Sequence, residues 1–397
     1  MTTASSFNAL KRIRTELAQL EAQGLQRSRH LLESPQGAHV RVDGRDLLSF
    51  CSNDYLGLAN HPALIAAASL AAHTNGVGTG ASHLITGHHV AHLALETRIA
   101  EFIGLPGALL FSTGYMANIG VVTALVGRDG EVFADRLNHA SLNDAALLSR
   151  AKFTRYPHND LLALERQLAA SQAAQKLVLV DAVYSMDGDL APLPDLLALC
   201  ERYDAWLLVD DAHGLGVLGP GGAGSLEQAG LVQRDVPLLM ATLGKALGCS
   251  GAFVAGPSAW IEGLVQFART YVYTTAMPPA LAAAALVAVQ RAQAESWRRD
   301  KLAALVARFR RGATELGLAL MNSSSAIQPL LLGSAEAAMT AMQALEVQGL
   351  LVTAIRPPTV PGGQARLRIT LSASHEEAHV DRLLAALETL RPPGRSG

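Results

Sequence analysis

A lysine, a carboxylate and two histidines each lie at or just beyond the end of a predicted strand. Lys245 lies in the glycine-flanked loop TLGKALG, between two short apolar segments that favour strands. Asp210 ends an earlier apolar segment, His213 follows it by three residues, and His139 follows another such segment. The stretch 112–115 (STGY) opens a predicted helix directly after a strand, and the free N–H groups at a helix start bind anions.

Each of these residues also has an ordinary structural interpretation. Lys245 alone is equally compatible with an exposed lysine in a turn, Asp210 with a cap, and the two histidines with hydrogen-bonded loop residues. Together they supply an amine, a carboxylate, two imidazoles and a phosphate cradle at one edge of a sheet. Those are the groups needed to hold pyridoxal 5′-phosphate (PLP).

Short apolar strands that alternate with helices predict an α/β fold with a largely parallel sheet covered on both faces. Ligands bind in the loops at the carboxyl ends of such strands, which places Asp210 and Lys245 at one edge. The predicted strands are Ala108–Phe111, Glu131–Ala134, Leu177–Asp181, Ala205–Asp210 and a segment ending at Ala241, and the predicted helices between them include Gly114–Leu125, Ser141–Ser149 and Leu193–Tyr203.

The two ends of the chain predict smaller elements around this sheet. The N-terminal part predicts an amphipathic helix over Leu10–Ala22 and a hairpin over Val40–Phe50 with its turn at Asp43 and Gly44. The last third predicts a small α+β domain that follows one long helix from Pro279 to Leu316. We expect three units, namely an N-terminal helix and hairpin segment (1–48), a large PLP-binding domain (49–283) and a small C-terminal domain (284–397).

Composition excludes several classes of partner. The 397 residues carry a formal net charge of −2, so no basic field is present to hold nucleic acid or a membrane surface. Cys51, Cys200 and Cys249 lie far apart and form neither a zinc knuckle nor a redox pair, which fits a reducing cytoplasm. The first 24 residues lack the apolar segment of a secretory signal, and no apolar run is long enough to span a bilayer.

Two stretches imitate known motifs. The sequence HEEAH at 375–379 matches the H-E-x-x-H helix of zinc peptidases, which gives an alternative function from another class. Little chain follows it to supply a third ligand, so we expect no metal there, and we interpret His88, His92 and Glu96 as a polar stripe on a helix. The run GLGVLG at 214–219 resembles a dinucleotide motif, but further loop follows it where that motif requires a helix.

Five stretches in order along the chain match a known family. They are 52–58 (SNDYLGL), 135–142 (DRLNHASL), 184–189 (YSMDGD), 209–214 (VDDAHG) and 242–248 (TLGKALG). They resemble the α-oxoamine synthases, and the resemblance runs from about residue 25 to the end. It implies a PLP-dependent transferase of the aspartate-aminotransferase type, with a large domain and a small C-terminal α+β domain. Such enzymes join an amino acid to an acyl thioester.

The resemblance also implies catalytic roles. Lys245 would bind PLP covalently and later act as general base, Asp210 would pair with the pyridine nitrogen, and His139 would stack on the ring. A catalytically silent relative is a further hypothesis, although each of these positions carries the residue that catalysis requires. The implied cofactor-binding residues are Gly114, Tyr115, His139, Ser185, Asp210, His213, Thr242, Lys245, Thr274 and Thr275. The last two would reach the cofactor of a partner subunit, so a homodimer with shared sites is expected.

Two further stretches, 273–280 (YTTAMPPA) and 354–361 (AIRPPTVP), resemble the members that use L-alanine and a pimeloyl thioester in biotin synthesis. The acyl carrier, CoA or acyl carrier protein, stays open, and a glycine C-acyltransferase is the alternative. Arg356 would bind the alanine carboxylate. The implied substrate-binding residues are Arg27, His139, Arg356 and Thr359, and Arg29 lies close enough to Arg27 to take its place.

Overall fold

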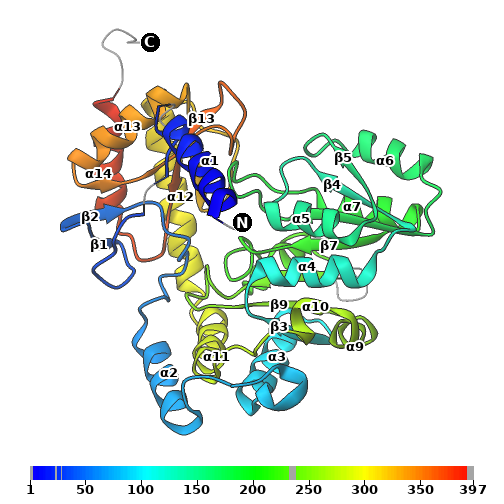
Figure 1. Ribbon diagram of the computed structural model, residues 1–397. Helices are drawn as coiled ribbons and strands as arrows, with labels where there is room; N and C mark the ends of the chain where they lie inside the picture. The colour runs from blue at the N-terminus through cyan, green and yellow to red at the C-terminus, as the bar shows by residue number, and fades with distance from the viewer. Residues whose placement is uncertain (1–2, 23–24, 28, 232–237, 391–397) are drawn as a thin grey trace.

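A seven-stranded sheet organises the computed structural model, which describes residues 3–22, 25–27, 29–231 and 238–390 (Figure 1). In spatial order its strands are β3 (Gly107–Phe111), β9 (Ala252–Gly256), β8 (Leu238–Thr242), β7 (Trp206–Asp210), β6 (Gln175–Asp181), β4 (Gly130–Asp135) and β5 (Lys152–Tyr156). β9 runs antiparallel to both of its neighbours, and the other neighbouring strands pair in parallel. The predicted α/β fold with a mostly parallel sheet is therefore confirmed.

The sheet sends alternate side chains into two separate hydrophobic cores. In β6, Leu177 and Leu179 pack in one core and Val178 and Val180 in the other. The first core is covered by α4 (Gly114–Leu125), α5 (Ala140–Ser149), α9 (Ser258–Phe267) and α10 (Arg269–Val272). The second is covered by α2 (Pro62–Asn75), α3 (Val90–Ile103), α6 (Leu161–Ala170), α7 (Leu193–Arg202) and α11 (Pro279–Ala294). Burial on both faces explains why these strands are continuously apolar.

The structure differs from the sequence predictions in two places. Strand β5 and helix α6 had not been expected, because β5 is an edge strand whose polar, partly exposed side chains hide its periodicity. The single long helix expected from Pro279 to Leu316 is in fact α11 followed by α12 (Trp297–Glu315). Between them the backbone of Glu295 leaves the helical region (φ −105°, ψ 61°), and its carboxylate accepts hydrogen bonds from Arg291 and Arg298.

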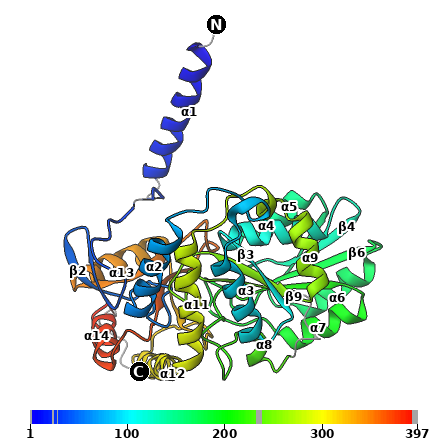
Figure 2. The same ribbon diagram turned by 90° about the horizontal axis from the view of Figure 1, so that it is seen from below.

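The C-terminal part forms a second sheet of three antiparallel strands in the order β10, β13, β12. Its elements are β10 (Ile327–Gly333), α13 (Ala335–Val347), β11 (Leu350–Leu351), β12 (Thr353–Ile355), β13 (Ala365–Thr370) and α14 (Glu377–Glu388). The predicted N-terminal hairpin is present as β1 (His39–Val42) and β2 (Arg45–Ser49), and β2 pairs in parallel with β11. Helix α1 (Thr3–Ala22) extends away from the rest of the molecule (Figure 2).

Two arginines of β13 hold the loop that follows β6. Arg366, which is completely buried, donates from Nη1 to Asp187 Oδ1 at 2.7 Å. Arg368 donates from Nε to the carbonyl oxygen of Ser185, also at 2.7 Å. Bonds between a buried guanidinium and its partners are costly to break, because the charge would be left unpaired. The C-terminal sheet therefore fixes the position of Ser185.

The HEEAH stretch does not form a zinc helix. His375 precedes α14, its Nδ1 accepts the N–H of Ser372 at 3.0 Å, and its Nε2 donates to the carbonyl oxygen of Ser49 at 2.7 Å. Because both ring nitrogens are committed, the first ligand of the zinc-peptidase alternative lacks a lone pair for a metal. Among the described helices, none combines the length and the hydropathy needed to cross a membrane.

Gly248 provides a test of this architecture, because it has φ +64° and a Cβ there would lie 2.3 Å from Ala59 N. We predict that Gly248→Ala lowers the free energy of unfolding by about 2 kcal/mol or more, through strain and the forced shift of the 58–59 backbone. Gly263→Ala in α9 is the matched control, since a Cβ there meets open space, and it should raise stability by about 0.5–1 kcal/mol. Denaturant unfolding measures both, and equal stability of Gly248→Ala and wild type would contradict the account.

Candidate active site

A cavity of about 210 Å³ lies at the carboxyl ends of β6, β7 and β8. The last residue of each of these strands, Asp181, Asp210 and Thr242 respectively, lines it. The sequence-predicted residues in its wall are Gly114, Tyr115, His139, Ser185, Asp210, His213, Thr242 and Lys245. Ser141, Asp181, Val183, Ala212 and Met240 complete the wall. The structure thus brings together residues from loops that are more than a hundred positions apart in sequence.

Lys245 reaches this cavity from the loop between β8 and β9. The loop turns back at Gly248, whose N–H donates to the carbonyl oxygen of Lys245 at 2.9 Å. The Lys245 Nζ lies 2.9 Å from His213 Nε2. Removal from water lowers the pKa of Lys245, while the carboxyl groups of Asp210 and Asp181 act in the opposite direction. A lowered pKa increases the share of neutral amine, which is the nucleophilic form of lysine.

Asn118 of α4 connects Asp210 to His139 and was missed by the sequence analysis. Its fully buried Nδ2 donates to Asp210 Oδ2 at 2.8 Å and to Ser141 Oγ at 2.9 Å. Since Ser141 Oγ accepts that bond, its hydroxyl proton is left for His139 Nδ1, 2.8 Å away. Partial burial lowers the pKa of His139, so the neutral ring is favoured and carries its proton on Nε2. An asparagine inside a mostly apolar helix is the only signal in the sequence for this connection.

Asp181 is the second buried carboxyl group in the wall. Its Oδ2 accepts the backbone N–H of His139 at 2.9 Å, and within the described part of the chain Oδ1 is buried without a hydrogen-bond partner. Burial and the neighbouring Asp210 raise the pKa of Asp181 well above its usual value. The sequence had placed Asp181 at a strand end but had assigned it no role, because its neighbours come from other loops.

The start of α4 supplies backbone N–H groups to the cavity. Thr113 caps the helix with its side chain, and Gly114 and Tyr115 form the first turn that lines the cavity. The first N–H groups of a helix have no partner within the helix, and its dipole favours an anion there. Thr242 lies nearby in the wall, with its hydroxyl donating to the carbonyl oxygen of Gly251 at 3.0 Å.

The predicted substrate residues Arg27, Arg356 and Thr359 line a second cavity of about 710 Å³. It lies between α1 and the loop that follows β12, and Leu17 and Leu20 of α1 contribute to its wall. Of the two candidate arginines, Arg27 lines this cavity and Arg29 does not.

The predicted cofactor residues Thr274 and Thr275 line neither cavity. Thr275 instead forms a β-bridge with Ser82, at the start of the π-helical turn η1 (His83–Gly87). Within one chain the structure therefore does not bring these two threonines to the other site residues.

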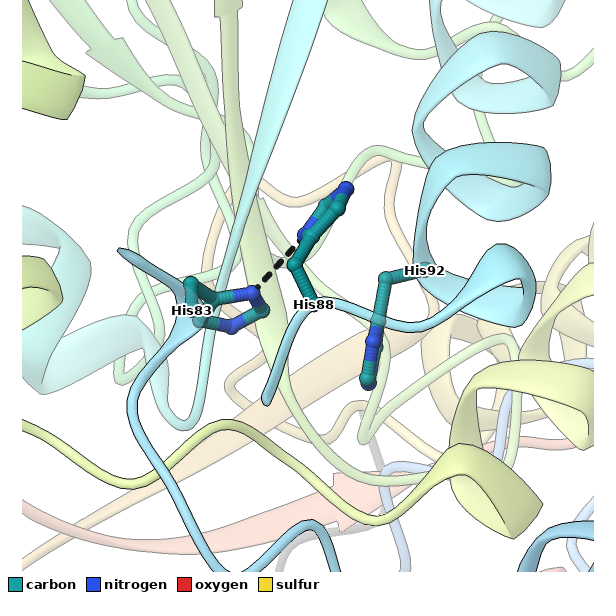
Figure 3. Close-up of side chains that lie close together, drawn as sticks. All are labelled: His83, His88 and His92. Carbon is teal, nitrogen blue, oxygen red and sulfur yellow. Dashed lines mark hydrogen bonds between the residues drawn. The ribbon is translucent and has the colours of Figure 1, made fainter. Parts of the chain in front are cut away.

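Three histidines gather beside the start of α3 (Figure 3). His83 Nδ1 and His88 Nδ1 lie 3.0 Å apart and share a hydrogen bond. His92 Nδ1 accepts the N–H of His89 at 2.8 Å, and its Nε2 donates to the carbonyl oxygen of Met277, also at 2.8 Å. Because both nitrogens of His92 are committed, it offers no lone pair to a metal. We interpret this cluster as a hydrogen-bonded connection between η1, α3 and the segment before α11.

Comparison with known proteins shows the family to which the chain belongs. The family model for aminotransferase class I and II matches residues 45–387. The 8-amino-7-oxononanoate synthase of Nitrosococcus oceani is 59% identical over 372 residues, which cover 94% of this chain and 99% of that protein. The enzyme of the same name from Pseudomonas syringae pv. tomato is 57% identical over 380 residues, which cover 96% of each.

Solved structures show the same architecture. A serine palmitoyltransferase variant from S. paucimobilis, solved with a bound PLP–myriocin aldimine, is 30% identical, has a TM-score of 0.90 and is matched over 98% of both chains. An 8-amino-7-oxononanoate synthase from Francisella tularensis is 28% identical, with a TM-score of 0.76 over 86% of this chain and 97% of that one. The chain therefore belongs to the class I and II aminotransferase family, on the branch that contains the 8-amino-7-oxononanoate synthases.

Proposed function

We propose that this protein condenses L-alanine with a pimeloyl thioester, carried by CoA or by acyl carrier protein, in a PLP-dependent reaction of biotin synthesis in the cytoplasm. The products are 8-amino-7-oxononanoate, CO₂ and the free thiol. The observation that carries the proposal is the presence of Lys245 and Asp210 in one cavity with the start of α4. The names of relatives that are 57–60% identical support the choice of substrates.

For each functional group of PLP, the first cavity has a residue that could bind it. Lys245 supplies the amine for its aldehyde, Asp210 a carboxylate for its pyridine nitrogen, and the N–H groups of Gly114 and Tyr115 a site for its phosphate. The imidazole of His139 supplies a face for the ring. The buried Asp181 Oδ1, without a partner among the described residues, is a further polar atom in this wall. When bound, PLP supplies an electron sink for the electrons left on the amino-acid Cα.

The protein's own groups hold and move the protons. Asn118 and the backbone N–H of Ala212 fix the orientation of the Asp210 carboxylate, which would keep the pyridine nitrogen protonated. The neutral amine of Lys245 would take the Cα proton as general base. His139, with its proton on Nε2, is placed to return one to the product.

The second cavity suits the substrates. Arg356 has a planar guanidinium that can bind the alanine carboxylate through two parallel hydrogen bonds. Arg27 and Thr359 provide polar contacts, and Leu17 and Leu20 provide apolar surface for an acyl chain.

We also propose that the protein works as a homodimer. Thr274 and Thr275 line neither cavity of their own chain, which supports a role at the cofactor phosphate of the partner subunit. Tyr273, beside them, exposes 73% of its surface and Phe267 exposes 67%, so both side chains are available for contact with a partner subunit.

The substrate assignment is tested by pairing L-alanine or glycine with pimeloyl-CoA or acetyl-CoA. We predict that alanine with pimeloyl-CoA gives the highest kcat/KM for thiol release and a product with the mass of 8-amino-7-oxononanoate. The methyl group of alanine and the longer acyl chain each add contacts with the protein, so a site that fits them favours these substrates. A higher kcat/KM for glycine with acetyl-CoA would instead identify a glycine C-acyltransferase.

Lys245→Ala should remove the visible absorbance of the bound cofactor and lower turnover by about a thousand-fold or more, because alanine can neither form the covalent link nor act as base. Lys152→Ala is the matched control, because Lys152 is an exposed residue of the edge strand β5 and does not line the cavity, and it should leave both readings unchanged. Full turnover in Lys245→Ala would overturn the assignment.

Asp210→Asn should leave PLP bound but lower kcat by about 100-fold or more, because an amide cannot hold a proton on the pyridine nitrogen. Spectroscopic titration of the cofactor and steady-state kinetics separate the two effects. Asp195→Asn, at an exposed position of α7, is the control for loss of a carboxylate and should behave as wild type. A fully active Asp210→Asn variant would show that the carboxylate has no such role.

A further inference from the structure

Tyr55 lies at the far end of a hydrogen-bond chain that leads to Lys245. The Tyr55 hydroxyl oxygen lies 2.6 Å from His213 Nδ1, and His213 Nε2 lies 2.9 Å from Lys245 Nζ. Tyr55 is 1% exposed and lies in the segment that follows β2, outside the wall of the cavity. Burial raises the pKa of Tyr55 to about 12, so the hydroxyl keeps its proton throughout the neutral range.

Asn53 determines the direction of this chain. Asn53 Oδ1 lies 3.2 Å from Arg368 Nη2, and a guanidinium can only donate, so the oxygen of the Asn53 amide faces this group. The same oxygen lies 3.2 Å from the Tyr55 hydroxyl, which therefore donates its single proton to Asn53. The Tyr55 oxygen is then left to accept the N–H of His213 Nδ1.

The state of His213 follows from these bonds. Removal from water lowers the pKa of His213 well below its usual value, so the ring is neutral. Lys245 in its ammonium form and the guanidinium of Arg368 lower this pKa further. A neutral ring with its proton on Nδ1 has its lone pair on Nε2, which faces Lys245 Nζ. Lys245 can then donate an N–H to His213 while its own lone pair stays free.

We propose that Tyr55 is a positioning residue that holds His213 in the Nδ1–H tautomer, and so keeps the lone pair of the Lys245 amine available for reaction. In the opposite tautomer, Nε2–H would donate to that lone pair and block it. This proposal rests on the proposed function, because that function is what requires a reactive Lys245. Tyr55 acts through His213 and does not itself contact the amine.

The titratable and charged groups around this series of hydrogen bonds stay unchanged when Tyr55 is substituted. Asp181 and Asp210 face Lys245 from the ends of β6 and β7, His139 faces His213 from the start of α5, and Arg368 faces both from β13. Burial, together with the charges of Asp210, Asp181 and Arg368, determines the pKa of Lys245 before any substitution. A difference between Tyr55→Phe and wild type therefore reports the hydroxyl group.

The experiment measures the reactivity of Lys245 in the full-length chain after PLP has been removed. Trace amounts of isotope-labelled acetic anhydride are added at a series of pH values, and peptide mass spectrometry compares labelling of Lys245 with that of the exposed Lys11. In Tyr55→Phe, an unpartnered Nδ1–H would be costly, so the proton moves to Nε2. We expect the half-point, which is the pH at which labelling of Lys245 reaches half its limiting rate, to fall by roughly half to one pH unit. The reason is that the ammonium form of Lys245 loses a hydrogen-bond acceptor. We expect the limiting labelling rate to fall by about threefold to tenfold, because the lone pair is blocked.

Two further variants separate this effect from a general loss of structure. Tyr156→Phe also removes a buried tyrosine hydroxyl, one without a hydrogen-bond partner in the described part of the chain, and should give the wild-type curve. In a His213→Ala background, Tyr55→Phe should cause no further change, because the connecting ring is gone.

The labelling experiment tests the role of Tyr55 without any measurement of turnover. An unchanged half-point, an upward shift, or the same shift in the His213→Ala background would overturn the role of Tyr55. Failure of the proposed function would appear elsewhere, as retained turnover in Lys245→Ala, and would leave the labelling result intact.

Discussion

The site depends on holding the amine of Lys245 away from bulk water beside two carboxyl groups. The parallel pairing of β6 with β7 sets Asp181 directly beside Asp210, and β7 pairs with β8, which leads to the lysine loop. An isolated ammonium in such a place would be strongly disfavoured, and so would two adjacent charged carboxylates. The raised pKa of Asp181 and the lowered pKa of Lys245 are two responses to this one constraint. Both shifts favour the neutral form of the group, and the neutral amine of Lys245 is the form that the proposed chemistry requires.

The groups around that amine are oriented from both halves of the molecule. Asn118 of α4 links Asp210 to the serine that hydrogen-bonds His139. From the other side, Arg366 and Arg368 of the C-terminal sheet hold the loop that carries Ser185. Because one hydrophobic core continues from the large sheet into the C-terminal elements, these supports are rigidly joined. The cavity is thus built by contacts between segments that are far apart in sequence.

The sequence predicted the elements whose signal is local. The apolar strands and the residues that follow them were found because period and position determine them, and Lys245, Asp210, His139 and His213 lie together as expected. Asn118 and Tyr55 were missed because their importance comes from partners in other segments. Spacing alone can also imitate a motif, as at 375–379, where the sequence analysis expected no metal and where His375 hydrogen-bonds backbone groups. The break between α11 and α12 was hidden because the helical period continues across Glu295.

The central claim is that Lys245, among all the lysines of the chain, is the one whose surroundings select it for covalent attachment of PLP. The most direct measurement is sodium borohydride treatment of the PLP-loaded protein, followed by peptide mass mapping. Lys11, Lys152, Lys176 and Lys301 are internal controls in the same digest. The account predicts that the mass of the reduced cofactor appears on the peptide containing Lys245 and on no other. Its appearance on a different lysine, or its absence from every lysine, would contradict the account.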